Sequence, residues 1–221
     1  MGIDQETGGN FVVDEANDRS CVVCRSNGLL EAVTLTEQTA ETEYHAEELE
    51  WVAEQCCEIM LEEFQRYTEE AEILVRRNFL LSLRRRIEEH MEITGVPKEA
   101  CSSTILSVCV DWNRGLYCVF QLGNGIIIAN GATPEPIFYP FSFRRNRTEN
   151  TTISEEALLD LQFERGRLGD IQGFVLMASD RIWTEICIGQ EEQERGIAIL
   201  HREGHRYERK DEEADCSKPC E

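Results

Sequence analysis

The sequence predicts an α+β domain in which two antiparallel β-sheets are flanked by helices. Three observations predict this fold class. Short β-rich runs with turn signals between them occupy the chain up to Thr36. Two long segments with apolar residues at every third or fourth position follow, and β-rich runs return after Pro97. Strands, two long helices and then further strands are typical of helices laid on mainly antiparallel sheets.

The first strands are predicted between Asn10 and Thr36. FVV and SCVVC each read as a short strand, and LLEAVTL follows the turn signal Ser26-Asn27-Gly28. This order predicts that the fold opens with a hairpin.

Two amphipathic helices are predicted next, over Glu41–Tyr67 and Thr68–Thr94. Apolar residues recur every three or four positions in both segments, and Gly95-Val96-Pro97 stops the second one. The first segment is rich in glutamate and the second in arginine, so neighbouring helices would pair charges across their solvated sides. We expect both helices to lie antiparallel on one outer face.

The chain then returns to strands. STILSVCVDW, LYCVFQL and GIIIANG read as three sequential strands that form a meander, with Gly123-Asn124-Gly125 as a tight hairpin turn. Ser154 is predicted to N-cap a short helix that runs to Leu161. FVLMASD and GIAILHR are predicted to be the closing strands.

The length and the net charge of the chain limit the classes of protein to which it can belong. A chain of 221 residues is expected to form one domain, over residues 1–202, followed by a charged tail over residues 203–221. A formal charge of −21 opposes binding to nucleic acid and to anionic membranes. The sequence contains neither a secretory signal nor a run of about 18 apolar residues. We therefore expect a cytoplasmic protein with no membrane contact.

The ten cysteines are expected to be reduced. Several stand in apolar runs, where cysteine behaves as a small buried hydrophobe. Cys21 and Cys24 form a CxxC, but a strand would point their side chains to opposite faces, so we expect no metal there. The tail holds four more potential zinc ligands, in an order and spacing that fit no common structural zinc pattern: His201, His205, Cys216 and Cys220.

Four short phrases follow one another between about Ala100 and Trp183. They are Ser102-Ser103-Thr104, Gly123-Asn124-Gly125, Asn150-Thr151-Thr152 and Ser179-Asp180-Arg181. This order resembles the bacterial PPM-type (type 2C) metal-dependent protein phosphatases, whose corresponding phrases include Gly-Asp-Gly and Ser-Asp-Gly. The resemblance implies a sandwich of two antiparallel sheets flanked by helices.

The resemblance also implies a chemistry. In that family, aspartates at the centre of the sandwich hold two Mg²⁺ or Mn²⁺ ions, which activate water to attack a phosphoserine or phosphothreonine. Asp180 matches one metal ligand, and Asp18 matches an acid that precedes the second strand. The central Asp-Gly pair, however, corresponds to Leu35-Thr36, and the last ligand falls near Glu194. Leucine offers no oxygen to a metal ion.

These missing ligands predict a domain that has lost metal-dependent catalysis and needs no metal cofactor. We expect it to act as a binding or regulatory module for a protein partner or a phosphoprotein. Candidate phosphate contacts are four arginines: Arg144, Arg145, Arg147 and Arg181.

Two alternatives stay open. One is an active Mn²⁺- or Mg²⁺-dependent serine/threonine phosphatase in which other acids, such as Glu37, replace the missing ligands. The other is an acidic interaction module that binds a basic partner through the glutamates between Glu41 and Glu72.

Overall fold

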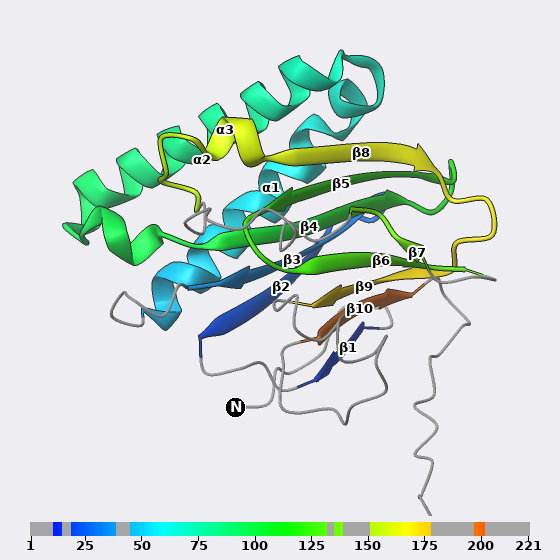
Figure 1. Cartoon of the computed structure of the whole chain (residues 1–221), viewed down its shortest axis with the longest axis horizontal. Coiled ribbons are helices and arrows are strands. Elements are labelled where there is room, and N and C mark those ends of the chain that lie inside the picture. Colours follow the sequence, from blue (N-terminus) through cyan, green and yellow to red (C-terminus); the bar gives the residue numbers. More distant parts are fainter. Residues whose placement is uncertain are drawn as a thin grey trace, which may run out of the picture.

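Two five-stranded sheets pack face to face in the computed structural model, and two long helices cover one of them (Figure 1). The structure describes residues 11–14, 19–38, 45–131, 135–138, 151–177 and 197–201, and of 11–14, 135, 177 and 197–201 it describes only the backbone. All strand pairs are antiparallel. The predicted fold class is therefore confirmed.

The sheet under the helices, here the helix-covered sheet, has the order β2-β3-β4-β5-β8. Its strands are β2 (Ser20–Ser26), β3 (Glu31–Glu37), β4 (Thr104–Asp111), β5 (Leu116–Leu122) and β8 (Gln162–Arg167). The second sheet has the order β1-β10-β9-β6-β7. Its strands are β1 (Phe11–Asp14), β10 (Ile197–His201), β9 (Gly173–Met177), β6 (Ile126–Asn130) and β7 (Glu135–Pro136).

The helices α1 (Ala46–Glu69) and α2 (Glu72–Thr94) form an antiparallel hairpin on the outer face of the helix-covered sheet, as predicted (Figure 1). The turn between them lies two residues later than the sequence predicted. Glu70 has extended backbone, and its N–H donates to Arg66 O at 2.8 Å, which closes α1. Gly95 ends α2 in the left-handed conformation, with φ at 76°. Residues 41–44 of the predicted first helix lie outside the described residues.

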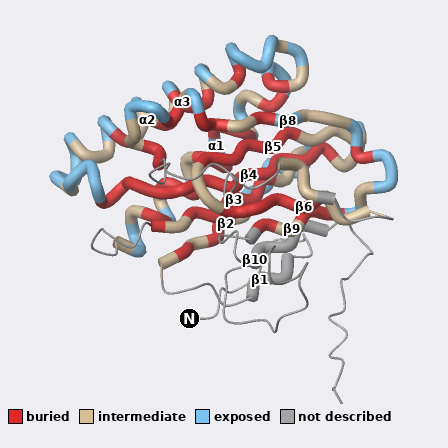
Figure 2. The backbone as a smooth tube through the Cα atoms, in the orientation of Figure 1, coloured by how far each residue is buried: buried red, intermediate tan, exposed pale blue. Residues whose placement is uncertain are grey.

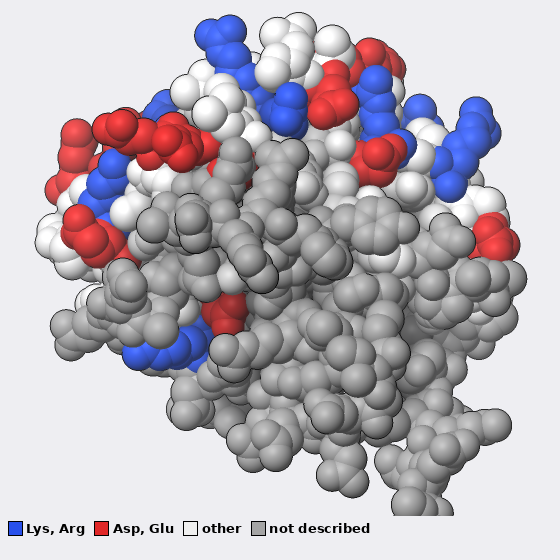
Figure 3. All heavy atoms as spheres, in the orientation of Figure 1, with Lys and Arg blue, Asp and Glu red and all other residues white. Residues whose placement is uncertain are grey.

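Charged side chains link the two helices. Arg86 of α2 contacts Glu58 and Glu62 of α1, at 2.9 and 2.6 Å. Acidic and basic side chains are interspersed over this part of the surface (Figure 3). The predicted charge pairing between the helices is thus confirmed.

One strand prediction was wrong, and it concerns β6. The hairpin of β2 and β3 is present as predicted, and β1 pairs with β10 in the second sheet. β4 and β5 pair as predicted, whereas β6 belongs to the second sheet, so the three strands form no meander. Gly123-Asn124-Gly125 carries the chain from one sheet to the other, with φ of 81° at Gly123 and 126° at Gly125. Glycine permits a tight turn, and such a turn can connect two strands of the same sheet or two strands of different sheets.

The predicted helix after Ser154 is shorter than expected. Helix α3 spans Ala157–Asp160, and Glu156 stands at its N-cap position. The Ser154 hydroxyl instead accepts the N–H of Thr151 at 2.9 Å, so it closes the preceding turn rather than capping the helix. The strand that follows, β8, was not predicted.

The core has two layers, one on each face of the helix-covered sheet. Buried residues run along the strands of that sheet (Figure 2). The helix-side layer packs residues such as Phe79 and Phe120, whose rings stack 4.1 Å apart, under the helices. The inter-sheet layer includes Val33, Leu35 and Leu176. Alternate residues of each strand enter different layers because strand side chains alternate between faces.

Cys21 and Cys24 follow this alternation, as predicted. Cys21 packs against the helix-side layer and Cys24 against the inter-sheet layer. The cysteines in the described residues are free: Cys21, Cys24, Cys56, Cys57, Cys101, Cys109 and Cys118. Of the four potential zinc ligands named above, His201 ends β10 and only its backbone is described. His205, Cys216 and Cys220 lie outside the described residues. Among the helices that the structure describes, none has the length and apolar character needed to span a membrane.

Candidate functional site

One edge of the sandwich, at the left of Figure 1, gathers the ends of strands from both sheets. In the helix-covered sheet, Glu37 at the end of β3 pairs with Ser20 and with Thr104. In the second sheet, Met177 at the end of β9 pairs with Ile126 and with Ile197. The described residues of three of the phrases that carry the resemblance therefore lie at or next to this edge: Ser102-Ser103-Thr104, Gly123-Asn124-Gly125 and Thr151-Thr152.

A row of polar side chains marks this edge on the inter-sheet face. Residues of one strand with even spacing share a face, and Val22, Leu35 and Leu106 belong to the inter-sheet layer. By this alternation the inward-facing residues at the edge are Ser20, Glu37, Thr104 and Gln121, which we call the polar end. Glu37 is the sole carboxylate at this end among the described strands of the helix-covered sheet.

The two positions that match the family's central Asp-Gly pair lie just inside the polar end. Leu35 is 1% exposed and packs in the inter-sheet layer. Thr36 faces the helices, where its hydroxyl donates to Leu49 O at 3.2 Å. Neither side chain presents an oxygen to the space between the sheets.

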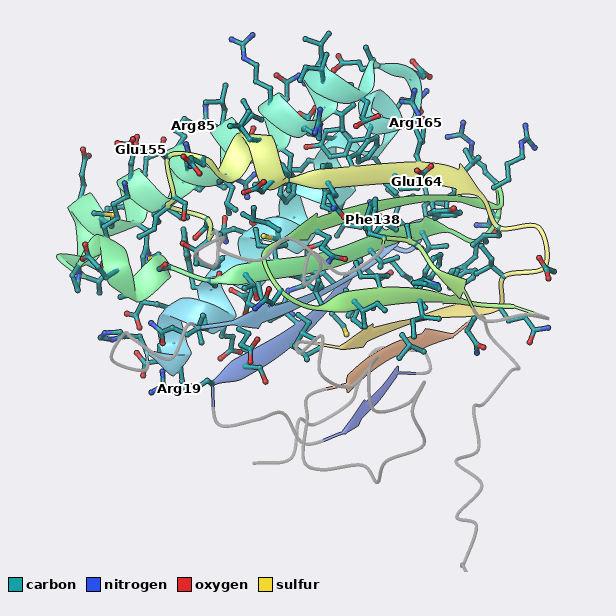
Figure 4. All side chains as sticks on the ribbon, in the orientation of Figure 1. Arg19, Arg85, Phe138, Glu155, Glu164 and Arg165 are labelled. Carbon is teal, nitrogen blue, oxygen red and sulfur yellow. The ribbon has the colours of Figure 1, made fainter. Side chains whose placement is uncertain are left out.

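The predicted metal ligands Asp18 and Asp180 lie outside the described residues, as do Glu194 and the arginines Arg144, Arg145, Arg147 and Arg181. Along the sequence, the described residues nearest to Asp18 and Asp180 are Arg19 and Met177. Arg19, labelled in Figure 4, directly precedes β2, and its carbonyl accepts the N–H of Gln38 at 2.9 Å. Met177, three residues before Asp180, ends β9.

The Gln121 side chain stabilises the turn by which the chain passes from β5 in one sheet to β6 in the other. Its side chain is fully buried, and Nε2 donates to Gly125 O at 2.9 Å. Its Oε1 is buried and has no hydrogen-bond partner among the residues that the structure describes. A free acceptor inside a protein is costly, so this atom is available to a donor that reaches the polar end. Asn124 in the same turn stands where the family carries an aspartate, which leaves one carboxylate fewer.

A second group of hydroxyls ties residues 151–154 to the start of β4. The Ser102 hydroxyl donates to Thr151 Oγ1 at 2.8 Å, and the Thr152 hydroxyl donates to Cys101 O at 2.7 Å. The N–H of Thr152 donates to Ser103 O at 3.0 Å. We call these contacts the hydroxyl clasp. Sequence reasoning named the phrases but missed that they bind each other, because the segments lie about fifty positions apart in the chain.

The described residues provide few ligands for a divalent metal ion. Among them no group of three or more histidine, cysteine, aspartate or glutamate side chains is placed to hold a metal ion. Mg²⁺ and Mn²⁺ need several oxygen ligands, preferably carboxylates. The described part of the polar end supplies one carboxylate, an amide oxygen and hydroxyls, which is a poor fit to a two-ion site.

Comparison with known proteins agrees with the fold. The family model for protein phosphatase 2C matches residues 50–180, which is more than half of the chain. A sequence comparison with curated proteins finds no match. Among solved structures, a bacterial serine phosphatase has a TM-score of 0.55 at 11% identity, with 91% of this chain and 100% of that chain covered.

Two further structures have the same fold. The serine/threonine phosphatase Stp1 from Staphylococcus aureus has a TM-score of 0.52 at 11% identity, with 92% of this chain and 98% of that chain covered. A C. elegans sex determining protein has a TM-score of 0.53 at 9% identity, with 89% of this chain and 65% of that chain covered. The sandwich, the order of the phrases along the sequence and the matched family model lead to one conclusion: the chain belongs to the protein phosphatase 2C family.

Proposed function

We propose that this protein phosphatase 2C domain has lost metal-dependent hydrolysis and acts as a binding or regulatory module. The observation that carries the proposal is Leu35. It occupies the place of the family's central metal-binding aspartate, and its 1% exposed side chain is packed in the inter-sheet layer. A hydrocarbon side chain supplies no ligand to a hard cation.

The surroundings of Leu35 support the proposal. The hydroxyl of Thr36 is engaged on the helix side with Leu49 O. Two dications at one point need several converging carboxylates, because the carboxylates must offset both the ions' mutual repulsion and their dehydration. With the central ligand gone, the affinity for such a pair falls steeply.

A second candidate is an active phosphatase with displaced ligands, and one observation favours it. Glu37 lies on the inward face at the end of β3, two residues beyond Leu35. A carboxylate there, together with Asp18 and Asp180, would give a smaller acidic cluster than the family uses.

Calorimetric titration with Mn²⁺ and hydrolysis of a phosphothreonine peptide decide between the two. We expect no saturable binding at millimolar Mn²⁺ and no hydrolysis above that of the variants E37Q and D180A. The wild type would be an enzyme, and the proposal wrong, if it hydrolyses the peptide with Mn²⁺ and if both variants abolish that hydrolysis.

For the bound partner we propose a protein that carries a phosphorylated serine or threonine. The arginines at positions 144, 145, 147 and 181 of the sequence support it, because guanidinium groups form paired hydrogen bonds to phosphate. A peptide pair that differs only in the phosphate tests this: the phosphorylated form should bind more tightly. The acidic-module alternative predicts instead that an unphosphorylated basic peptide binds, and that salt weakens its binding.

A further inference from the structure

We propose that Arg84 of α2 is the positioning residue that fixes residues 151–154 against the start of β4. Its meaning for function rests on the proposed function as a binding module, with the polar end taken as the place where the ligand binds. The contacts of Arg84 do not depend on that function, because they are made within the chain.

Arg84 is engaged with main-chain oxygens. Its Nε donates to Thr152 O at 3.1 Å, and its Nη2 donates to Ser154 O. The residue is partly buried, and among the described residues it makes no ion pair. A guanidinium group is suited to bind two carbonyls that lie two residues apart, because its N–H groups lie in one plane and point in fixed directions.

The segment that Arg84 holds is the one that makes the hydroxyl clasp. Thr151 and Thr152 are buried, at 5% and 0% exposure, and both bind the Cys101–Ser103 stretch through their side chains or backbone. Arg84 therefore acts on the start of β4 through Thr152. The order of contacts runs from α2 to residues 151–154 and then to the polar end.

Neighbouring arginines show that this arrangement is specific to position 84. Arg85, labelled in Figure 4, has a 72% exposed side chain, and its ion pair within the described residues is with Glu89, at 3.7 Å. Arg86 pairs with glutamates of α1. Three consecutive arginines thus face three different environments, because successive helix positions point about a quarter turn or more apart. Arg84 alone of the three contacts residues 151–154.

The position of Arg84 links α2, through residues 151–154, to Cys101–Ser103, which directly precede Thr104 of the polar end. If α2 shifts relative to the sheet, the two carbonyls lose their donor, and the clasp loses the contact that holds it from outside. A displacement of α2 would then change the shape of the ligand site without any contact between α2 and the ligand.

Hydrogen exchange followed by mass spectrometry tests the proposal in the full chain. In R84Q, the backbone amides of residues 151–156 and 101–104 should exchange roughly tenfold faster or more, because the two hydrogen bonds from the charged guanidinium are lost. Exchange in β2 and β3 should stay unchanged. R85Q is the matched control, and its exchange should equal the wild type throughout.

R84K separates charge from geometry. Lysine keeps the positive charge and the aliphatic stem but not the fork, so it should restore only part of the lost protection. The proposal is overturned if R84Q leaves residues 151–156 as protected as in the wild type, if exchange rises equally everywhere, or if R84K restores full protection. If R84Q does not fold, R84K alone decides, and wild-type protection in it overturns the proposal. No ligand or activity enters this measurement, so its outcome is separate from that of the proposed function.

Discussion

Leu35 and Glu37 lie on the same face of β3, two residues apart, and the boundary between the core and the polar end runs between them. Leu35 is buried in the inter-sheet layer, whereas Glu37 is partly exposed at its rim. Both positions face the space between the sheets. A carboxylate is solvated at position 37, and at position 35 it would be surrounded by hydrocarbon.

Leu35→Asp should therefore destabilise the protein strongly at neutral pH. An unpaired buried charge costs about 3–5 kcal/mol of unfolding free energy, and the lost leucine packing adds to this. Urea unfolding at pH 7 measures the loss.

Leu35→Asn is the control, because it has the same shape without the charge. The gap between the two variants should close as the pH falls to about 4, where the buried carboxyl of L35D is protonated. Equal stability of the two variants at pH 7 would mean that the introduced carboxylate is solvated or bound to a cation, and that position 35 is open to ligands.

Arg86→Gln should weaken the contact between the helices. Arg86 is 18% exposed and bridges Glu58 and Glu62, so its loss should lower the unfolding free energy by about 1 kcal/mol, and less at high salt. Arg85→Gln is the matched control, with an expected change within about 0.5 kcal/mol. Denaturant unfolding at low and high salt measures both. A loss in R86Q that salt does not reduce would assign the effect to packing of the arginine stem.

The sequence was sufficient to predict the helices and the first hairpin because their signals are local. The apolar spacing in α1 and α2 and the Ser26-Asn27-Gly28 turn depend on residues near one another in the chain. The partner of β1 and the sheet that β6 joins depend on residues far away in the sequence. Strand pairing over such distances leaves no local signal, and the Gly123-Asn124-Gly125 turn fits either outcome.

The same distinction applies to the polar end. The resemblance predicted that Leu35 stands in place of an aspartate, and the structure places the Leu35 side chain in the core. β8 was missed because its sequence, QFERGR, carries three charges and a glycine. Such a composition is typical of an edge strand, where charged residues discourage pairing with other chains, and it lacks the apolar alternation of a central strand. The Arg84 contacts and the hydroxyl clasp together join three separate segments and have no sequence signature.

Gly166→Ala should destabilise the edge of the helix-covered sheet. A Cβ at this position would lie 2.7 Å from the Tyr117 hydroxyl oxygen and 2.8 Å from its ring carbon Cζ. Overpacking of this kind costs about 1–3 kcal/mol. A double-mutant cycle with Tyr117→Ala measures the coupling: the cost of G166A should shrink when the ring is absent. An unchanged cost would assign the effect to the backbone of β8.

The buried thiols should make the protein less stable in alkali. Burial raises the pKa of Cys57 from 9.0 to about 12, and it does the same for Cys118. A raised thiol pKa means that the folded state keeps a proton that the unfolded state releases above about pH 9. The stabilisation is therefore complete below pH 9 and is lost as the pH rises toward 12. Cys57→Ala removes one such thiol, so the plot of unfolding free energy against pH should be shallower between pH 9 and 11 than in the wild type. Parallel plots for the two proteins would show that Cys57 ionises as easily in the folded state as in the unfolded one.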